Sequence, residues 1–241
     1  MLKMFITAIV LMLASCTHSG AERAQEIKAE FGESIYRLES SNGHGTGFVV
    51  KNNKGKNVII TNGHVCEGYR TMTAVAKNGD RITVRVIHES PLTDLCLLQA
   101  PKRSKALHIG NTPKKDQEAF IVGYPLGPFM VASVGRIKGY TRTSAKLDTR
   151  LELCRLPKHR IIEVEIPIRK EDGTIFKIKE KICTMQVKSY FTTIPADRGF
   201  SGSPLLNDDG EVIGVIMATQ GNISWGTAVP LKELKKYLKL K

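Results

Sequence analysis

The chain has 241 residues with a formal net charge of +13, and 41% of its residues are hydrophobic. This length can bury a large core, and the composition excludes a disordered or low-complexity chain. The lysines are spread along the chain without interleaved aromatics, so we expect a solvated basic surface and no nucleic-acid partner. No metal-ligand spacing or phosphate-binding loop is present, so we expect no metal and no cofactor.

Residues 1–15 are a predicted signal peptide, because a positive charge precedes an apolar run over 4–13 that is too short to span a bilayer. The run ends in Leu13-Ala14-Ser15-Cys16, which resembles a bacterial lipobox with Cys16 as the lipidated residue. An ordinary secretory signal is the alternative. We therefore expect an extracytoplasmic, lipid-anchored protein of the bacterial cell envelope. Because Thr17 is not aspartate, the outer membrane is the expected destination in a Gram-negative cell.

The remainder of the chain reads as an all-β protein. A tether over 16–30, with a short polar helix over 21–31, precedes the first predicted strand. Short alternating segments separated by Gly, Asn, Asp and Pro then follow one another, which is typical of all-β folds. The clearest of these predicted strands are 46–50, 57–61, 82–88, 94–99, 118–123, 130–139, 185–193 and 211–218.

A histidine and an aspartate stand at the ends of two predicted strands. Thr61-Asn62-Gly63-His64-Val65-Cys66 follows an apolar strand, and Leu92-Thr93-Asp94-Leu95 opens another. Taken alone, His64 would be a structural histidine and Asp94 a turn or cap residue. The two residues are 30 positions apart, a spacing that suits one hairpin and a return strand.

Residues 151–188 alternate with a period of two. Ile162, Val164, Ile166 and Ile168 share one face, whereas Glu163 and Glu165 lie on the other. The turn sequence Glu171-Asp172-Gly173 then precedes a second alternating stretch, which predicts a long β-hairpin. This hairpin either extends the domain or acts as a flap over an active site or a partner-binding arm.

Four cysteines remain besides Cys16, and an exported protein can form disulfides. Cys154 and Cys183 flank the base of the predicted hairpin, so a disulfide between them is plausible. Cys66 and Cys96 each lie two positions after His64 or Asp94. They form either a second disulfide or two buried free thiols.

The segment Gly199-Phe200-Ser201-Gly202-Ser203-Pro204 places a serine between two glycines. Such a string is often only a turn. Here it would also present the Ser201 hydroxyl as a nucleophile beside two backbone donors, the N–H groups of Gly199 and Ser201. A serine hydroxyl needs a base that is itself oriented, and His64 and Asp94 supply both residue types.

The blocks around His64, Asp94 and Ser201 resemble the three signature blocks of trypsin-like serine proteases, over roughly residues 31–230. The likeness is closest to bacterial members, the DegP/HtrA-type protease domains and the V8-like glutamyl endopeptidases. It implies two six-stranded antiparallel β-barrels, over 31–115 and 116–230, with the hairpin 151–188 inserted in the second. It also implies that His64 is the general base, that Asp94 orients it, that Ser201 attacks, and that the amides of Gly199 and Ser201 form the oxyanion hole.

The resemblance predicts a serine endopeptidase that cleaves proteins or peptides outside the cytoplasm through an acyl-enzyme. A catalytically silent binding protein that uses the hairpin is one alternative, and an esterase is another. Because the chain stops soon after the second predicted barrel, we expect no PDZ domain and a monomer.

Several positions depart from the family pattern. Phe200 replaces the aspartate that pairs with a new N-terminus in trypsin-type enzymes, so we expect no activation by N-terminal insertion. Pro195 stands where basic-residue specificity needs a carboxylate. Ala218, Thr219 and Gly226 are the candidate pocket walls by position, which favours small or medium apolar residues before the cut. The V8-like alternative is cleavage after glutamate.

The end of the chain, 231–241, is a predicted helix. Pro230 suits a helix start, and Leu231, Leu234 and Leu238 fall on one face with lysines opposite. We expect this helix to dock on the second barrel, with a membrane-surface role as the alternative.

Overall fold

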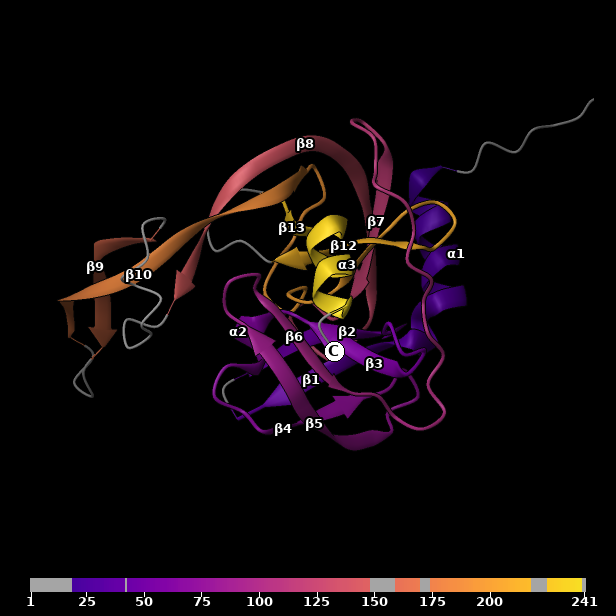
Figure 1. The fold of residues 1–241 in the computed structure, drawn as a ribbon, viewed down its shortest axis with the longest axis horizontal. Helices are drawn as coiled ribbons and strands as arrows, with labels where there is room; N and C mark the ends of the chain where they lie inside the picture. Colours follow the sequence, from indigo (N-terminus) through magenta and orange to yellow (C-terminus); the bar gives the residue numbers. More distant parts are fainter. Residues whose placement is uncertain (1–18, 42, 148–158, 170–173, 218–224, 240–241) are drawn as a thin grey trace, which may run out of the picture.

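The computed structural model describes residues 19–41, 43–147, 159–169, 174–217 and 225–239. Within these residues the chain forms two antiparallel β-barrels, a projecting arm of strands and helices at both ends (Figure 1). The architecture confirms the predicted all-β fold. The predicted signal peptide over 1–15, the predicted lipidation site Cys16 and the predicted hairpin turn over 171–173 lie outside the described residues.

The first barrel consists of six antiparallel strands in the order β1-β2-β3-β6-β5-β4, closed by pairing of β1 with β4. Alternate residues of its strands face opposite sides. Val49 and Ile59 fill the barrel interior, whereas Phe48 and Ile60 join the core between the barrels. The strands are β1 (Ile35–Ser40), β2 (Gly43–Lys51), β3 (Asn57–Thr61), β4 (Thr71–Val75), β5 (Arg81–Ser90) and β6 (Leu95–Gln99).

The second barrel also has six strands, in the order β7-β8-β10-β13-β12-β11, and pairing of β11 with β7 closes it. Ala119, Ile121 and Ile213 belong to its interior, and Phe120, Val122 and Val212 belong to the core shared with the first barrel. Its strands are β7 (Glu118–Gly123), β8 (Val131–Leu147), β10 (Ile175–Thr192), β11 (Pro204–Leu206), β12 (Val212–Met217) and β13 (Thr227–Pro230).

The long strands β8 and β10 continue beyond this barrel and carry β9 (His159–Arg169) on the outer edge of β10. Figure 1 shows this arm extending away from both barrels. β9 and β10 pair antiparallel from Ile175 opposite Arg169 to Met185 opposite His159. On one face, Lys177 bonds Glu165 at 3.0 Å and Lys179 pairs with Glu163 at 3.2 Å.

The N-terminal helix α1 (Gly20–Phe31) begins with a capping box, in which Ser19 and Glu22 exchange side-chain to backbone hydrogen bonds. Its buried residues, Ala24 and Ile27, join the core shared by the barrels. The helix packs on β7 and β8, so it covers the second barrel before a 3₁₀ turn (Gly32–Ser34) leads the chain into β1 (Figure 1).

The C-terminal helix α3 (Leu231–Lys239) follows β13 directly. Its apolar residues Leu231, Leu234, Tyr237 and Leu238 are buried, and it packs on β12 and β13 of the second barrel. The Tyr237 hydroxyl also donates to the His88 carbonyl of the first barrel at 2.8 Å. Among the helices of the described residues, none has the length and apolarity needed to cross a membrane.

Candidate active site

His64 lies on a four-residue helix, α2 (Gly63–Cys66), directly after β3. Asn62 stands at the N-cap position with an extended backbone, which turns the chain out of the strand. Its side chain donates from Nδ2 to the Asp94 carbonyl at 3.1 Å. Asn62 is fully buried and therefore fixes the backbone before His64 to the backbone at Asp94.

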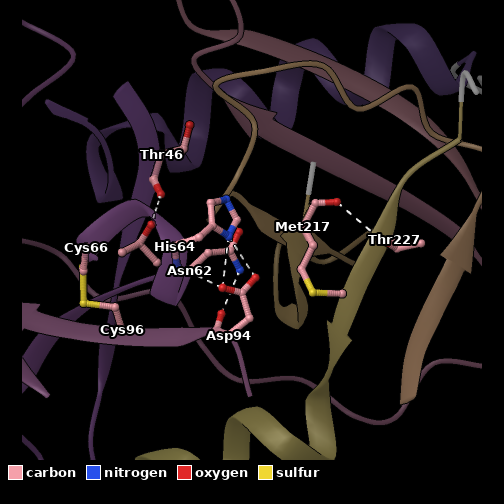
Figure 2. A network of polar contacts seen from close by, with 9 residues as sticks. Thr46, Asn62, His64, Cys66, Asp94, Cys96, Met217 and Thr227 are labelled. Carbon is pink, nitrogen blue, oxygen red and sulfur yellow. Dashed lines mark hydrogen bonds and ion pairs between the residues drawn. A yellow bond between two sulfur atoms is a disulfide. The ribbon is translucent and has the colours of Figure 1, made fainter. Parts of the chain in front are cut away.

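Asp94 stands immediately before β6, in a left-handed backbone conformation with φ of 50°. Its Oδ1 accepts from the His64 backbone N–H, and both carboxylate oxygens lie 3.0 Å from His64 Nδ1 (Figure 2). An ionised carboxylate only accepts hydrogen bonds, so Nδ1 carries the ring proton. Nε2 is then the free basic nitrogen, which is the tautomer that a general base requires.

The surroundings of His64 favour its charged form. Burial of the ring opposes protonation, but the hydrogen bond and charge of Asp94, with a further contribution from Glu67, outweigh it. The pKa of His64 is therefore raised above its ordinary value of 6.5. The side chain of Asp94 is 15% exposed and that of His64 is 47% exposed, so the imidazole remains open to solvent on one side.

Ser201 follows a tight turn in which the Phe200 N–H donates to the Asp197 carbonyl at 3.1 Å. Gly199 has a φ of +94°, which a residue with a side chain rarely adopts. A Cβ at this position would also collide with the Tyr124 carbonyl. Glycine is thus required here for both conformation and space.

The N–H groups of Gly199 and Ser201, both buried residues, have no hydrogen-bond partner among the described residues. The N–H groups of Phe200, Gly202 and Ser203 are paired, with the carbonyls of Asp197, Ile216 and Phe200 respectively. The Arg198 carbonyl accepts from the Leu126 N–H, so the Gly199 N–H of the same trans peptide points the opposite way. Unpaired N–H groups on buried residues are rare, and two of them together could hold an oxygen anion.

Thr46 on β2 anchors this turn to the first barrel. Its hydroxyl donates to the Gly199 carbonyl at 2.7 Å and accepts from the Tyr124 N–H at 3.0 Å, and its own N–H donates to the Ser201 carbonyl at 2.8 Å. Thr46 is fully buried. One residue of the first barrel therefore holds the residues on both sides of Phe200, Gly199 through its side chain and Ser201 through its backbone.

The structure also requires the second glycine of the motif, Gly202. It has a φ of +83°, and a Cβ there would collide with the Thr46 carbonyl and the Thr61 hydroxyl. Glycine at this position therefore lets the serine turn lie directly against the first barrel.

Ser201 and His64 approach the same point of the first barrel. Gly45 on β2 is flanked by Val65, the neighbour of His64, and by the Ser201 carbonyl, since a Cβ there would lie 2.8 Å and 3.2 Å from them. Among the described residues, no hydrogen bond joins Ser201 Oγ to the His64 ring. The segments of Ser201 and His64 therefore both reach Gly45, without a direct bond between the serine hydroxyl and the imidazole.

Cys66 and Cys96 form a disulfide, the alternative to free thiols that the sequence left open (Figure 2). Both cysteines are fully buried. The bond joins α2 to β6 and so ties the segment of His64 to the segment of Asp94. The other predicted pair stays a prediction, because Cys154 lies outside the described residues.

Of the predicted pocket walls, Ala218 and Thr219 lie outside the described residues, and Gly226 is described. The Gly226 N–H donates to the Ile194 carbonyl at 2.8 Å, and its carbonyl accepts from the Thr192 N–H at 2.9 Å. A Cβ at Gly226 would lie 3.1 Å from the Cβ of Ala196, so there is little space beside Gly226. Neither residue carries a charge.

A cavity of about 130 Å³ lies beside the Asp94 segment, where the base of the arm meets α3. Its lining residues are Leu92, Thr93, Lys188, Ser189, Met217, Val229 and Glu233. Sequence reasoning missed this junction. It also missed Asn62 and Thr46, although Gly45-Thr46-Gly47 offers a signal: a threonine between two glycines in an apolar strand.

Comparison with known proteins agrees with this geometry. Residues 45–215 match the family model of the trypsin-like peptidase domain. The serine protease Do-like HtrA of Bacillus subtilis is 25% identical over 206 residues, which are 82% of this chain and 39% of that protein. The periplasmic pH-dependent serine endoprotease DegQ of Escherichia coli is 24% identical over 239 residues, 95% of this chain and 45% of that protein. The chain thus spans less than half the length of these relatives.

Solved structures share the fold. The active form of the protease Rv3671c from M. tuberculosis superposes with a TM-score of 0.63 at 20% identity, covering 99% of this chain and 92% of that one. The serine endoprotease from Yersinia pestis gives a TM-score of 0.60 at 16% identity, over 88% of this chain and 64% of that one.

Proposed function

This chain belongs to the family of trypsin-like peptidase domains, and on that premise we propose that it is a serine endopeptidase. Two features carry the proposal. The N–H groups of Gly199 and Ser201 are unpaired, and His64 Nδ1 is held by Asp94 at 3.0 Å. The segments of both features meet at Gly45, which Val65 and the Ser201 carbonyl approach. A binding protein of the same fold has no physical need for either feature.

In the proposed mechanism, Ser201 Oγ attacks the scissile carbonyl while His64 Nε2 takes its proton. Asp94 holds the imidazole in the tautomer with the proton on Nδ1 and stabilises the imidazolium that forms. His64 then returns the proton to the leaving amine, and water releases the acyl group through the same base. The bond from Ser201 to His64 forms as the substrate enters, since such bonds often tighten only in the complex.

The Gly199 and Ser201 N–H groups supply the charge stabilisation for the tetrahedral oxyanion. Both donors are fixed before the substrate arrives, because Thr46 holds the carbonyl groups of these same two residues. Donors that need no reorganisation at the moment of reaction contribute more than mobile ones. One such donor is worth about 10²–10³ in kcat.

The proposed substrates are proteins with small or medium apolar residues before the cut. The narrow, uncharged surroundings of Gly226 and the exposed Pro195 in place of a carboxylate support this specificity. Ala218 and Thr219 complete the proposed pocket.

We place the enzyme outside the cytoplasm, anchored to the membrane through a lipid on Cys16. The apolar segment that ends in Leu13-Ala14-Ser15-Cys16 supports this location, as does the word periplasmic in the name of DegQ. The buried disulfide between Cys66 and Cys96 is compatible with an oxidising compartment. Metabolic labelling with a palmitate analogue, lost in Cys16→Ser, tests the anchor.

The test of activity uses the purified full chain with a fluorophosphonate, which reacts covalently with an activated serine. We expect labelling of the parent and none of Ser201→Ala, followed by cleavage of an unstructured protein by the parent alone. Circular dichroism establishes that both proteins are folded. A folded parent that stays unlabelled would overturn the proposal, and labelling without protein cleavage would point to an esterase.

A further inference from the structure

Eight cationic side chains are exposed on three segments of the fold: the end of β2 with the turn that follows it, the turn after β6 and the last turns of α3. We call this set the basic face. It consists of Lys51, Lys54, Lys56, Lys102, Arg103, Lys105, Lys236 and Lys239.

Hydrogen bonds join these three segments into one continuous surface. Asn57 donates from Nδ2 to the Ser104 carbonyl at 2.6 Å, which links the turn before β3 to the turn after β6. Asn53 donates from Nδ2 to the Lys239 carbonyl at 3.2 Å, which links the first turn to the end of α3. Segments that are far apart in sequence therefore place their positive charges side by side.

The charges of the basic face are uncompensated. None of its eight cations makes an ion pair with another described residue, whereas Lys138, Lys177 and Lys179 elsewhere each hold a carboxylate. The stretches 40–66, 95–115 and 234–241, which carry the basic face, contain no aspartate or glutamate. Like charges gathered without partners repel one another and attract an external anion.

The basic face lies at the end of the first barrel opposite the candidate active site. The first residues of β2 include His44 and Gly45, and the strand ends at Lys51. β3 starts at Asn57 and leads to His64, and β6 starts after Asp94 and leads to Lys102. Three strands thus have the catalytic segments at one end and the basic face at the other.

We propose that the basic face docks the protein on a membrane surface of anionic lipid headgroups. Seven of its eight cations are lysines, which act as point charges toward phosphate and lack the planar fork that reads base edges. No exposed large hydrophobic or aromatic side chain lies within its described segments, so nucleic-acid bases would find no stacking platform. A sheet of phosphate headgroups needs neither feature.

Binding of the full chain to vesicles tests this docking. The vesicles contain phosphatidylcholine alone or with phosphatidylglycerol, and cosedimentation measures the bound fraction at several salt concentrations. The variant Lys54→Gln, Lys56→Gln, Lys102→Gln, Arg103→Gln removes four charges of the basic face. Because each lysine contributes about a factor of five in affinity for an anionic surface, we expect binding to weaken roughly a hundredfold or more.

A matched control removes four exposed charges from the arm: Arg142→Gln, Lys177→Gln, Lys179→Gln, Lys181→Gln. It has the same net charge as the test variant, and we expect it to bind anionic vesicles as the parent does. Circular dichroism shows that each variant is folded, independently of peptidase activity. Because every protein keeps residues 1–18, the N-terminal segment contributes equally to all measurements.

The proposal is overturned if the two variants lose anionic binding equally, since net charge alone would then explain it. It is also overturned if the basic-face variant binds like the parent. Tighter binding of the parent to duplex DNA than to anionic vesicles at the same salt concentration would assign the face to nucleic acid instead. Selective loss in the basic-face variant, reversed by salt in the parent, supports docking on lipid.

Discussion

At the scale of single residues, Thr46 connects the serine turn of the second barrel to the first barrel. Its hydroxyl is both donor and acceptor, so it satisfies the Gly199 carbonyl and the Tyr124 N–H together. Both partners are buried in the protein, and neither has another described side-chain partner. Removal of this hydroxyl therefore leaves two unsatisfied backbone groups next to the nucleophile.

We predict that Thr46→Val lowers both stability and kcat, whereas Thr46→Ser keeps most of each. Valine matches threonine in shape but has no hydroxyl, so the loss reports the hydrogen bonds. Each unsatisfied buried group costs about 1–3 kcal/mol. Urea unfolding and steady-state kinetics with a peptide substrate measure the two effects. Equal kcat values for the two variants would contradict an anchoring role.

The raised pKa of His64 sets the acid side of the activity profile. A protonated His64 cannot accept the Ser201 proton, so kcat/KM falls as the pH drops through this pKa. Since the pKa is raised from 6.5, the midpoint of the acid limb is expected above pH 6.5. The measurement is kcat/KM of the parent against pH.

Asp94→Asn tests the cause of that shift. The amide removes the charge and the acceptor that raise the pKa of His64, while burial continues to lower it. We expect the acid limb to move toward lower pH and kcat to fall by about 10⁴, because the ring loses its required tautomer. An unchanged midpoint in the residual activity would show that Asp94 does not set the pKa.

His64, Asp94 and Ser201 could be predicted from sequence because each stands in its own local motif at a strand end. Asn62 and Thr46 could not, because their importance depends on partners far along the chain. Thr46 and Gly199 are 153 positions apart, and only the packing of the two barrels brings them within 2.7 Å. No local pattern encodes such a contact. The catalytic roles themselves stay predictions.

At the scale of elements, the disulfide between Cys66 and Cys96 connects the two segments that supply His64 and Asp94. It closes a loop with a sequence separation of 30 residues, and both cysteines are fully buried. The hydrogen bonds of Asp94 also hold these segments together. The disulfide therefore supports the histidine and aspartate pair and is not its sole connection.

The double variant Cys66→Ala, Cys96→Ala is predicted to lose about 3–4 kcal/mol of unfolding free energy, the chain-entropy value for a loop of this size. We expect a smaller effect on kcat, because the carboxylate still holds the ring. Denaturant titration and kinetics on the same preparation separate the effects. Reductant applied to the parent serves as the control and should reproduce the stability loss. A stability equal to that of the parent would count against the bond.

The bounds of an element could be predicted only where its sequence is periodic. The segments 57–61 and 118–123 are strands within the predicted bounds, because their apolar residues are flanked by turn residues. β8 and β10 run for 17 and 18 residues, longer than the predicted 130–139 and 185–193. The extension of β10 pairs with β9 within 151–188, where the alternating sequence predicted a hairpin. The extension of β8 beyond residue 139 was not predicted. The helix α2 has only four residues, too few for a helical period.

At the scale of the whole molecule, two barrels could be expected from the family resemblance, but their joint core could not. Ala24 and Ile27 of α1 pack in the same cluster as Phe48 of the first barrel and Phe120 of the second. A polar helix with so narrow an apolar face gives no indication of which barrel it covers. The helix leads into the first barrel, as the sequence predicts, but its own packing is on β7 and β8 of the second.

The basic face and the candidate active site lie at opposite ends of the first barrel, so the two proposals together predict an active site that stays accessible on the membrane. β2 spans nine residues, about 30 Å at 3.3 Å per residue. A protein docked through the basic face therefore keeps Ser201 far from the lipid. We predict that fluorophosphonate labels the vesicle-bound parent at the rate of the free protein, within about twofold. Reactions quenched at successive times and read by in-gel fluorescence measure both rates.

The same experiment distinguishes docking from burial of the site. Trp225 and Phe129 are exposed aromatic residues outside the basic face, at 47% and 79%. Docking through either would be driven by apolar contact and would resist salt, whereas docking through lysines is reversed by salt because screening weakens exposed charges. A large drop in labelling on anionic vesicles that salt does not restore would mean that another face meets the lipid. Labelling that stays constant while salt releases the protein fits only a docked face remote from Ser201.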